Sequence, residues 1–276
     1  DSVTPGDLSE LRREIYDLLR EGNPKLRDNK VLKSECLYPL AEAFPIAPMH
    51  IGAFVDFYSG INHASNVGRM FRPDMPPLLP NYRHLPVGYN GRASSVIPSG
   101  QPVIRPKGQT KGANDELPTY GPTKELDFEL EMGFYLGSGT EIGETLSIGE
   151  AESKMIGFVL VNDWSARDVQ RWEYQPLGPF LAKTFGTSIS PWVVTPDALE
   201  PFRVEGPKQD PAPFPYLRQG AKRNYNVTLD ILLKGKAMSD YARISRSNFK
   251  YMYWSSVQQL MHHACTGCAM SVGDLL

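Results

Sequence analysis

The stretch from Leu126 to Tyr135 constrains the fold of this chain most, because it alternates polar and apolar residues through most of its length. Successive side chains of an extended strand point to opposite faces, so the run predicts a strand with Asp127, Glu129 and Glu131 on one face. Residues two positions apart on such a face lie about 7 Å from each other, and carboxylates that close repel unless one is protonated, water surrounds both, or a cation lies between them. The run therefore predicts either a solvated outer face or a cation site.

Two further acids interrupt or end apolar runs elsewhere in the chain. Asp56 lies inside the short apolar run 51–58, where a carboxylate is costly to bury without a partner. Asp163 ends the nearly continuous apolar run 155–164, which is typical of a strand buried on both faces. A capping or salt-bridged role for Asp56 remains an alternative to a ligand role.

A helix is expected to begin directly after Asp163. Ser165-Ala166-Arg167-Asp168 has the S-x-x-[DE] form of a helix start. In such a helix Arg167, Gln170 and Tyr174 fall on one face. A buried strand that delivers an acid to this polar face would form one wall of a binding site.

The composition is that of an ordinary globular protein with room for a substantial core. The chain has 276 residues, of which 41% are hydrophobic and 22% are charged. Its formal net charge of -2 offers no broad basic surface for nucleic acid or an anionic membrane, and no run approaches the roughly 20 apolar residues of a membrane helix. Small molecules and other subunits are therefore the expected partners.

The three cysteines are too few for a disulfide scaffold, so the reducing cytoplasm is the expected location. Cys265 and Cys268 have the CxxC spacing, and His262 and His263 precede them. A zinc site needs about four such ligands in a tetrahedron, and the sequence has one cluster. We favour a pair of reduced thiols at a helix end, with a zinc or redox site as the alternative.

Residues 1–48 are expected to be the remnant of an N-terminal region and a helical linker. Leu8 to Glu21 places its leucines and Ile15 on one helical stripe, which should pack on the body of the protein or on a partner, and Gly22-Asn23-Pro24 ends the helix. The main domain is expected to begin near residue 49, after a segment punctuated by prolines. The chain starts without an initiator Met, so we expect a piece of a longer protein.

A second helix is expected from Ser247 to His263. Its predicted buried side consists of Phe249, Tyr253, Val257, Leu260 and Met261.

The acids of the predicted strands form a set that suits a hard cation. They are Asp56, Glu129, Glu131 and Asp163. Oxygen ligands favour Ca²⁺ in a large, flexible cavity and Mg²⁺ or Mn²⁺ in a smaller, octahedral one. Four carboxylates around one dication leave about two excess negative charges, which Lys183, Arg167 and Arg72 could offset.

A metal in this setting would act as a Lewis acid for a chelating, oxygen-rich substrate. His63 is then a candidate general base. A hydrogen-bonded structural imidazole is the alternative for this residue.

Several long motifs, in order along the chain, resemble the fumarylacetoacetate hydrolase family. They are Asp56-Phe57-Tyr58-Ser59, His63 to Gly68, His84 to Tyr89, Gly91 to Ser95, Glu129-Leu130-Glu131 and Asn162 to Asp168. Trp172-Glu173-Tyr174, Pro176 to Leu181 and Asn248 to Trp254 extend the similarity, which runs from about residue 49 to the end. The family pattern continues beyond Leu276, so we expect residues 49–276 to be a catalytic domain that is incomplete at its C-terminus.

The resemblance implies a mixed, β-rich α+β fold, with a β-roll catalytic domain and peripheral helices, and a homodimer. It also implies hydrolysis of a carbon–carbon bond in 4-fumarylacetoacetate to fumarate and acetoacetate, the last step of tyrosine and phenylalanine breakdown. Relatives that hydrolyse acylpyruvates or isomerise their substrates suggest one alternative activity. A non-catalytic binding protein with a vestigial site is the other.

Carried over residue by residue, the resemblance also implies roles within the site. The Ca²⁺ ligands would be Asp56, Glu129, Glu131 and Asp163, and a second, Mg²⁺-type site would involve Asp163, Lys183 and Thr187. The catalytic residues would be His63 as the base, Lys183 and Arg167, and the substrate would be held by Tyr58, Arg72, Tyr89, Gln170 and Tyr174. Because an ammonium group is a poor metal ligand, we expect Lys183 to stabilise an enolate or oxyanion instead.

Overall fold

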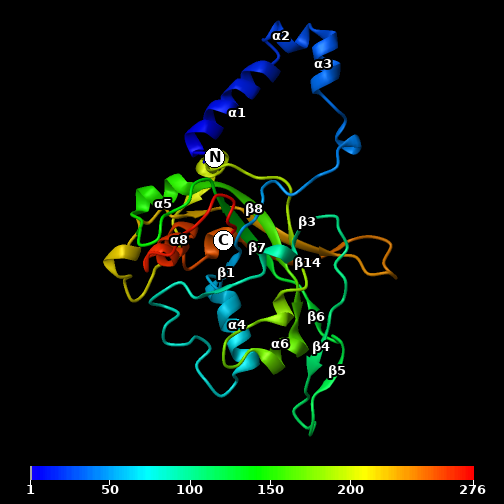
Figure 1. Ribbon diagram of the computed structural model, residues 1–276, viewed down its shortest axis with the longest axis vertical. Helices are drawn as coiled ribbons and strands as arrows, with labels where there is room; N and C mark the ends of the chain where they lie inside the picture. The colour runs from blue at the N-terminus through cyan, green and yellow to red at the C-terminus, as the bar shows by residue number, and fades with distance from the viewer. Residues whose placement is uncertain (1) are drawn as a thin grey trace.

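The computed structural model describes residues 2–276, which form a strand-rich body with helices around it (Figure 1). The strands are β1 (Val55–Phe57), β2 (Gly88–Asn90), β3 (Val96–Pro98), β4 (Lys107–Thr110), β5 (Thr119–Pro122), β6 (Leu126–Asp127), β7 (Leu130–Leu136), β8 (Met155–Asp163), β9 (Ser165–Ala166), β10 (Thr187–Ile189), β11 (Arg203–Val204), β12 (Asn224–Tyr225), β13 (Thr228–Leu233) and β14 (Ala242–Asn248). The α-helices are α1 (Pro5–Leu19), α2 (Pro24–Arg27), α3 (Lys30–Cys36), α4 (Ile61–Phe71), α5 (Ile148–Lys154), α6 (Arg167–Glu173), α7 (Pro196–Leu199) and α8 (Ser256–Ala264). This mixed α+β architecture agrees with the predicted fold class.

A sheet with the strand order β3-β10-β8-β7 forms the centre of the body. β10 runs parallel to β3 and antiparallel to β8, and β7 runs antiparallel to β8. Phe158 on β8 belongs to one buried hydrophobic cluster, whereas its neighbour Val159 belongs to another. Because neighbouring side chains of a strand point to opposite faces, β8 is covered on both sides, which confirms that prediction.

The segment from Leu126 to Tyr135 forms two strands with different partner strands, so the prediction of one continuous strand was wrong. β6 pairs with β9, with Asp127 opposite Ser165, and β7 pairs with β8, with Leu130 opposite Asn162. The break at residues 128–129 lies opposite the end of β8, where the opposing segment of the same chain passes from β8 into β9. The regular strand pairing is thus interrupted where Glu129 and Asp163 lie, although the backbone N–H of Asp163 still donates to the carbonyl of Glu129 (3.1 Å).

The last residues of the chain lie between β1 and β7. The backbone N–H of Val55 donates to the carbonyl of Leu275 (3.0 Å), and the N–H of Phe134 donates to the carbonyl of Leu276 (2.9 Å). These bonds place β1, which carries Asp56, next to the strand that carries Glu131.

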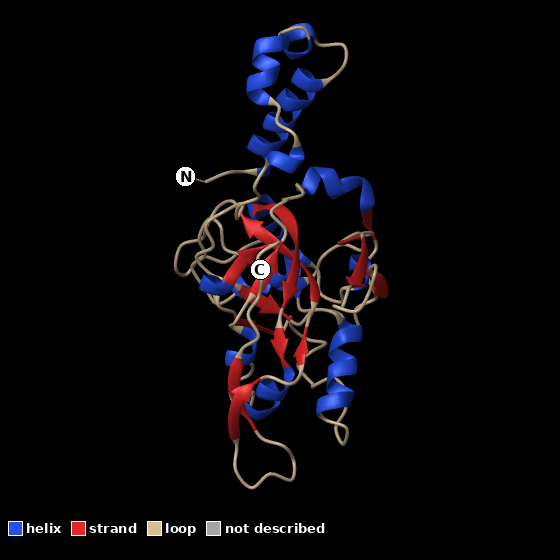
Figure 2. Cartoon of the chain, turned by 90° about the vertical axis from the view of Figure 1, so that its right-hand side faces the viewer, coloured by secondary structure: helices blue, strands red, loops and turns tan. Residues whose placement is uncertain are grey.

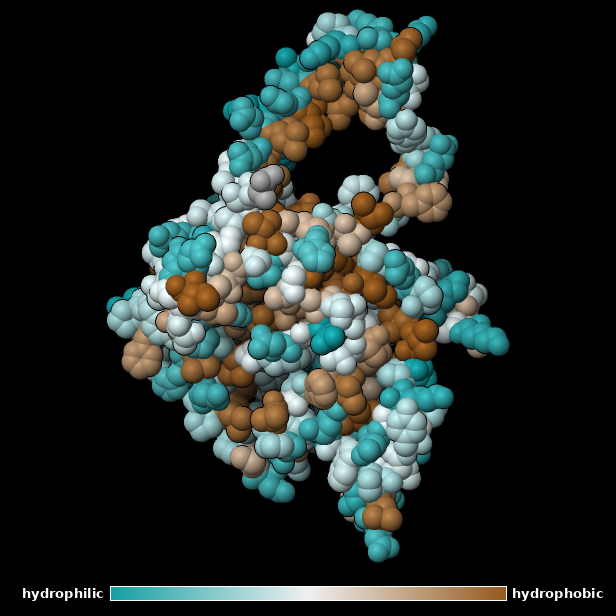
Figure 3. Space-filling model, viewed as in Figure 1, coloured by the Kyte–Doolittle hydropathy of each residue, from teal (hydrophilic) through white to brown (hydrophobic). Residues whose placement is uncertain are grey.

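Helices α1, α2 and α3 stand away from the body at one end of the molecule (Figures 1 and 2). α1 begins at a capping box in which Thr4 and Asp7 bond to each other's backbone N–H, with Pro5 in the first turn. The helix was predicted correctly, but Leu11, Ile15 and Leu19 of its apolar stripe are exposed. Figure 3 shows hydrophobic residues gathered along the inner side of the projecting segment. Packing of the whole stripe on the body was therefore wrong, since only Leu8 contacts the core, whereas packing on a partner stays a prediction.

α8 starts nine residues later than the sequence predicts, at Ser256 rather than Ser247. Strand pairing with β13 holds the chain extended up to Asn248, a short 3₁₀ turn follows at Phe249–Tyr251, and Ser255 caps α8 in a capping box with Gln258. The predicted buried side is nevertheless confirmed, since Phe249, Tyr253, Val257, Leu260 and Met261 are all buried. None of the helices in residues 2–276 is both long enough and apolar enough to cross a membrane.

Candidate metal centre

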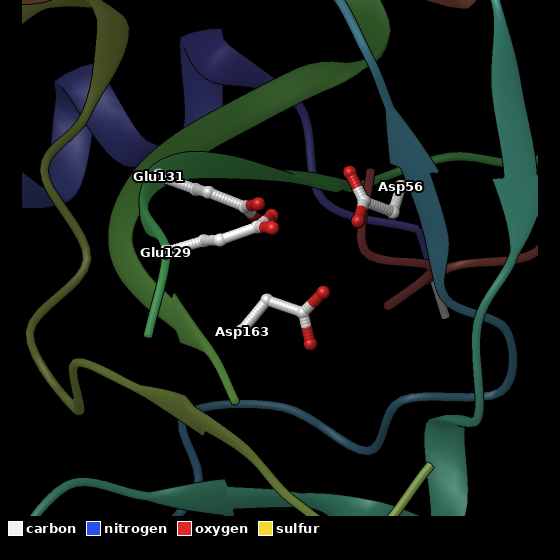
Figure 4. A group of neighbouring side chains, drawn as sticks. All are labelled: Asp56, Glu129, Glu131 and Asp163. Carbon is white, nitrogen blue, oxygen red and sulfur yellow. The ribbon is translucent and has the colours of Figure 1, made fainter. Parts of the chain in front are cut away.

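Four carboxylates from three separate parts of the chain converge in one place (Figure 4). Asp56 comes from β1 and Asp163 from the end of β8. Glu129 directly precedes β7, and Glu131 is the second residue of β7. One oxygen from each acid lies within 4.8 Å of the others. The solvated outer face that the alternation also allowed is excluded for Glu129, whose side chain is mostly buried.

Strand register brings a tyrosine between two of these acids. Asp56 lies opposite Tyr89 in the β1–β2 pair, so the two residues are direct cross-strand neighbours. The hydroxyl of Tyr89 donates to Oδ2 of Asp163 at 3.2 Å. Tyr89 therefore links the β1 side of the cluster to the end of β8.

Lys183 lies inside the cluster as a buried ammonium group. Its Nζ is 2.7 Å from Oδ2 of Asp163 and 2.9 Å from Oε2 of Glu129. Burial lowers the pKa of Lys183, but the surrounding carboxylates outweigh this effect and raise the pKa above its ordinary value. Thr187 lies on the other side of Asp163, and its hydroxyl donates to Oδ1 at 3.3 Å.

Arg167 holds three groups around the edge of the site. Its Nη2 donates to Oε1 of Glu129 (2.5 Å), its Nε to Oδ2 of Asp127 (2.8 Å) and its Nη1 to Oε1 of Gln170 (2.9 Å). The predicted helix thus exists and directs Arg167 and Gln170 to the site. Its predicted capping box was wrong, because Ser165 lies in β9 and Asp168 instead accepts hydrogen bonds from Thr123 and the backbone of Lys124.

The four acids have very different pKa values without a cation. Burial would raise the pKa of Glu129, but Lys183 and Arg167 lower it to about 2. Burial and the neighbouring Asp163 raise the pKa of Asp56 to about 7, and burial together with Asp56 raises that of Glu131 well above its usual range. The salt bridges that reach this cluster within residues 2–276 end on Glu129 and Asp163. Within the same residues, Asp56 and Glu131 have no such ion pair, and their raised pKa values favour the protonated form when no cation is bound.

His63 lies at the start of α4, beside the cluster. Its Nε2 is 3.8 Å from Oε1 of Glu129, and its ring packs edge-on against Tyr58 with the centroids 5.4 Å apart. Although 45% of the side chain is exposed, partial burial lowers the pKa of His63 below its ordinary value, and together with the charges of Arg167 and Lys183 it outweighs the raising effect of Glu129. A neutral imidazole in this position can accept a proton.

The remaining predicted residues lie along the side of the site formed by α4 and α6. Arg72 follows α4 and has a buried Nε without a hydrogen-bond partner among residues 2–276. Burial raises the pKa of Tyr58 to about 12, and the charge of Arg72 offsets part of this rise. Tyr174 follows α6 and packs edge-on against Phe71 at 6.1 Å. Gln170 thus contacts Arg167, Tyr58 contacts His63, and Tyr174 contacts the end of α4.

The residues fit a hard divalent cation. All four potential ligands offer carboxylate oxygens, and once all four are ionised their charge exceeds that of Lys183 and Arg167. A dication would supply the two charges that the two cations leave uncompensated. The cluster could therefore hold a metal ion.

The cysteines near the C-terminus form no comparable centre. Within the described residues 2–276, Cys265 and Cys268 belong to no group of three or more potential metal ligands. Both thiols are free, and Cys265 directly follows α8. The position of Cys265 at the helix end agrees with the favoured interpretation, and the state of the thiols stays a prediction.

Comparison with known proteins identifies the family of this chain. The family model described as "Fumarylacetoacetate (FAA) hydrolase C-terminal" matches residues 53–276. The chain belongs to this family. The match begins just before β1 and includes all four acids of the candidate metal centre.

A curated member of the fumarylacetoacetate hydrolase family is similar over nearly the whole chain. The fumarylacetoacetase of Rattus norvegicus is 52% identical over 267 residues, which cover 97% of this chain. The matched part is 64% of the rat protein, so the chain spans less than two thirds of that relative's length.

Solved structures support the same fold at lower sequence identity. A 5-carboxymethyl-2-hydroxymuconate delta-isomerase from Mycobacterium smegmatis superposes with a TM-score of 0.53 and 17% identity, covering 86% of this chain and 71% of that one. The fumarylpyruvate hydrolase from Pseudomonas aeruginosa, solved in complex with Mn²⁺ and pyruvate, has a TM-score of 0.50 and 16% identity, covering 82% of this chain and 76% of that one. At such identities the likeness concerns the fold alone.

One residue of the site, Asp127, was not assigned to it from the sequence. Asp127 belongs to the acidic face that the alternation predicts, but only its contact with Arg167 connects it to the site. The available signal was its position two residues before Glu129 on the same predicted face.

Proposed function

We propose that this chain is the catalytic part of a metal-dependent hydrolase that cleaves 4-fumarylacetoacetate to fumarate and acetoacetate. The observation that carries the proposal is the convergence of four carboxylates around Lys183, with Arg167 and His63 at the edge. The 52% identity to a protein named fumarylacetoacetase supports the choice of substrate.

The cation of this proposal is Ca²⁺, held by the four converging acids. They are Asp56, Glu129, Glu131 and Asp163. A second, Mg²⁺-type site would lie by Asp163 and Thr187, with Lys183 beside it as a hydrogen-bond donor rather than a ligand. When bound, the cation would act as a Lewis acid toward the oxygens of a 1,3-diketone. The Mn²⁺ of the Pseudomonas aeruginosa fumarylpyruvate hydrolase supports a divalent metal in this fold.

The protein side chains would provide the proton transfers and the charge stabilisation. His63, whose lowered pKa favours the neutral imidazole, would take a proton from the attacking water. Hydroxide adds to one carbonyl carbon, the carbon–carbon bond breaks, and its electron pair forms an enolate, which accepts the proton from the imidazolium. Lys183 would donate a hydrogen bond to the developing oxyanion or enolate, and Arg167 would add positive charge at the edge.

The substrate would be held along the wall of α4 and α6. The residues in this role are Tyr58, Arg72, Tyr89, Gln170 and Tyr174. The unpartnered Nε of Arg72 suits a carboxylate at one end of the substrate. In this proposal residues 49–276 are the catalytic domain, residues 1–48 are a linker, and the protein acts as a cytoplasmic homodimer.

An ultraviolet assay that follows loss of the diketone absorbance tests the proposal. We expect activity with Ca²⁺, none with excess chelator, and a loss of at least about a hundredfold in His63→Ala. Arg69→Ala is the matched control, because Arg69 lies on the same helix but is exposed and contacts Asn66. Activity that survives both the chelator and His63→Ala would refute the assignment of metal and base.

A further inference from the structure

We propose that Asp127 is a positioning residue, which orients Arg167 so that Glu129 stays available to a cation. This inference rests on the proposed metal centre and assigns a role to an acid outside the four converging ligands. Asp127 lies on β6, whereas Glu129 lies beyond the break that separates β6 from β7.

The guanidinium group of Arg167 explains why a second acid matters. Nε–H and one Nη–H point from the same edge of a guanidinium group, and one carboxylate can accept from both. In this structure the edge is shared, because Nε donates to Asp127 (2.8 Å) and Nη2 donates to Glu129 (2.5 Å). Glu129 therefore receives one hydrogen bond from Arg167 through Oε1, and its Oε2 faces Lys183 at 2.9 Å.

The other end of the guanidinium group is also occupied. Nη1 donates to Oε1 of Gln170, one helical turn further along α6. The side chain of Arg167 is only 14% exposed, so its position is set by these three acceptors rather than by water. If Asp127 is removed, Nε loses its acceptor, and the free edge can take Glu129 with two hydrogen bonds. A carboxylate held in that way competes less well for a cation.

The topology brings Asp127 to this edge. It lies opposite Ser165 in the β6–β9 pair, two residues before Arg167. The backbone N–H of Arg167 also donates to the carbonyl of Glu125 (2.9 Å), which fixes the start of α6 against this strand. The side chain of Asp127 is 44% exposed, so its degree of burial does not require an acid at this position, and the contact with Arg167 is what distinguishes it.

A neighbouring pair provides the natural comparison. Arg171 on the same helix donates to both oxygens of Glu125, at 3.3 and 2.7 Å. This pair uses the Nη1–Nη2 end of the guanidinium group. The two-bond arrangement on the Nε edge, which Asp127 prevents between Arg167 and Glu129, is formed by Arg246, whose Nε and Nη2 donate to the two oxygens of Asp230 at 2.7 Å each. Arg171 and Glu125 are both about half exposed and lie outside the metal cluster.

Calorimetric titration of Ca²⁺ into four forms of the chain tests the inference. They are the unmodified protein, Asp127→Ala, Asp127→Asn and Glu125→Ala. We expect Asp127→Ala to bind Ca²⁺ about tenfold more weakly, as is typical when a group that orients a metal ligand is lost. Asp127→Asn should recover most of the affinity, since its amide oxygen can still accept from Nε, and Glu125→Ala should match the unmodified protein.

The outcomes separate this inference from the proposed function. Equal Ca²⁺ affinity in Asp127→Ala and the unmodified protein overturns the positioning role and leaves the metal centre intact. Failure of the unmodified protein to bind Ca²⁺ overturns the metal centre and this inference with it. Asp127 could instead only hold β6 against α6. In that case Asp127→Ala and Glu125→Ala would lose thermal stability equally and would bind Ca²⁺ with the same affinity, and this result would also contradict the inference. If Asp127→Ala does not fold, Asp127→Ser, which is polar but too short to reach Nε, gives the same test.

Discussion

The ammonium nitrogen of Lys183 lies 2.7 Å from Oδ2 of Asp163, and both side chains are almost completely buried. A charged pair removed from water is stabilising only if its members neutralise each other and find hydrogen bonds. Lys183 meets this condition by also facing Glu129. It is therefore an internal counter-ion of the cluster as well as a proposed catalytic donor.

Replacement of Lys183 by Met should destabilise the metal-free protein. The change leaves Asp163 and Glu129 buried without their cation, so we expect the free energy of unfolding to fall by about 3–5 kcal/mol in denaturant titrations with chelator. Lys154→Met is the control, because Lys154 donates to the carbonyl of Gly139 and should lose only about 1 kcal/mol. Equal losses in the two variants would contradict the counter-ion role.

The metal-free protein should lose stability as the pH rises from about 6.5 to about 8. Burial and neighbouring acids raise the pKa of Asp56 to about 7 and that of Glu131 well above its usual range, so the folded state holds protons that the unfolded state has released. The pKa of His63 is lowered in the folded state, so below pH 6.5, its ordinary pKa, this residue makes stability rise with pH. The pH window of the prediction therefore begins at about 6.5.

Thermal unfolding with and without Ca²⁺ checks this pH dependence. With chelator, the Tm should be lower at pH 8, by about 2–4 °C for each kcal/mol lost. Added Ca²⁺ should raise the Tm more at pH 8 than at pH 6.5, because fewer protons compete for the acids. A Tm that rises with pH in the presence of chelator would show that Asp56 and Glu131 are ionised in the folded state.

Tyr89→Phe should weaken cation binding. Its hydroxyl donates to Asp163 at 3.2 Å, so the substitution removes a group that orients a proposed ligand, and we expect about tenfold lower Ca²⁺ affinity by calorimetry. Tyr58→Phe should leave that affinity unchanged, because the hydroxyl of Tyr58 points to the carbonyl of Ala64 at 3.5 Å. An effect of Tyr89→Phe on KM alone would instead favour a role limited to substrate binding.

Gly68→Ala should destabilise the protein, although alanine is normally the better helix residue. A Cβ at position 68 would overlap the backbone carbonyl of Pro77, which cannot move as a flexible side chain could. We expect a loss of about 1–3 kcal/mol in denaturant titrations and lower activity, because α4 also carries His63. Gly149→Ala on α5 meets nothing within 4 Å and should be neutral or stabilising. Equal stability of the two variants would mean that α4 shifts freely.

Local patterns predicted much of the fold. The apolar run of β8, the helix α1 and the buried side of Phe249 to Met261 were recognisable because side-chain periodicity depends on neighbours in the sequence. Element ends were less predictable. Ser165 entered a strand rather than a helix cap because β6 pairs with it from 38 residues away, at Asp127.

The sequence by itself determined the chemistry available to this protein: which side chains are acids, which strand faces they share, and which cations can balance them. Only the tertiary structure decided that Asp56, Glu129, Glu131 and Asp163 meet, and that Asp127 reaches Arg167 instead. The physical reason is that these contacts depend on long-range backbone pairing. The register of β1 with β2 and the insertion of the C-terminal residues between β1 and β7 set them, and neither arrangement is encoded in any short stretch of the chain.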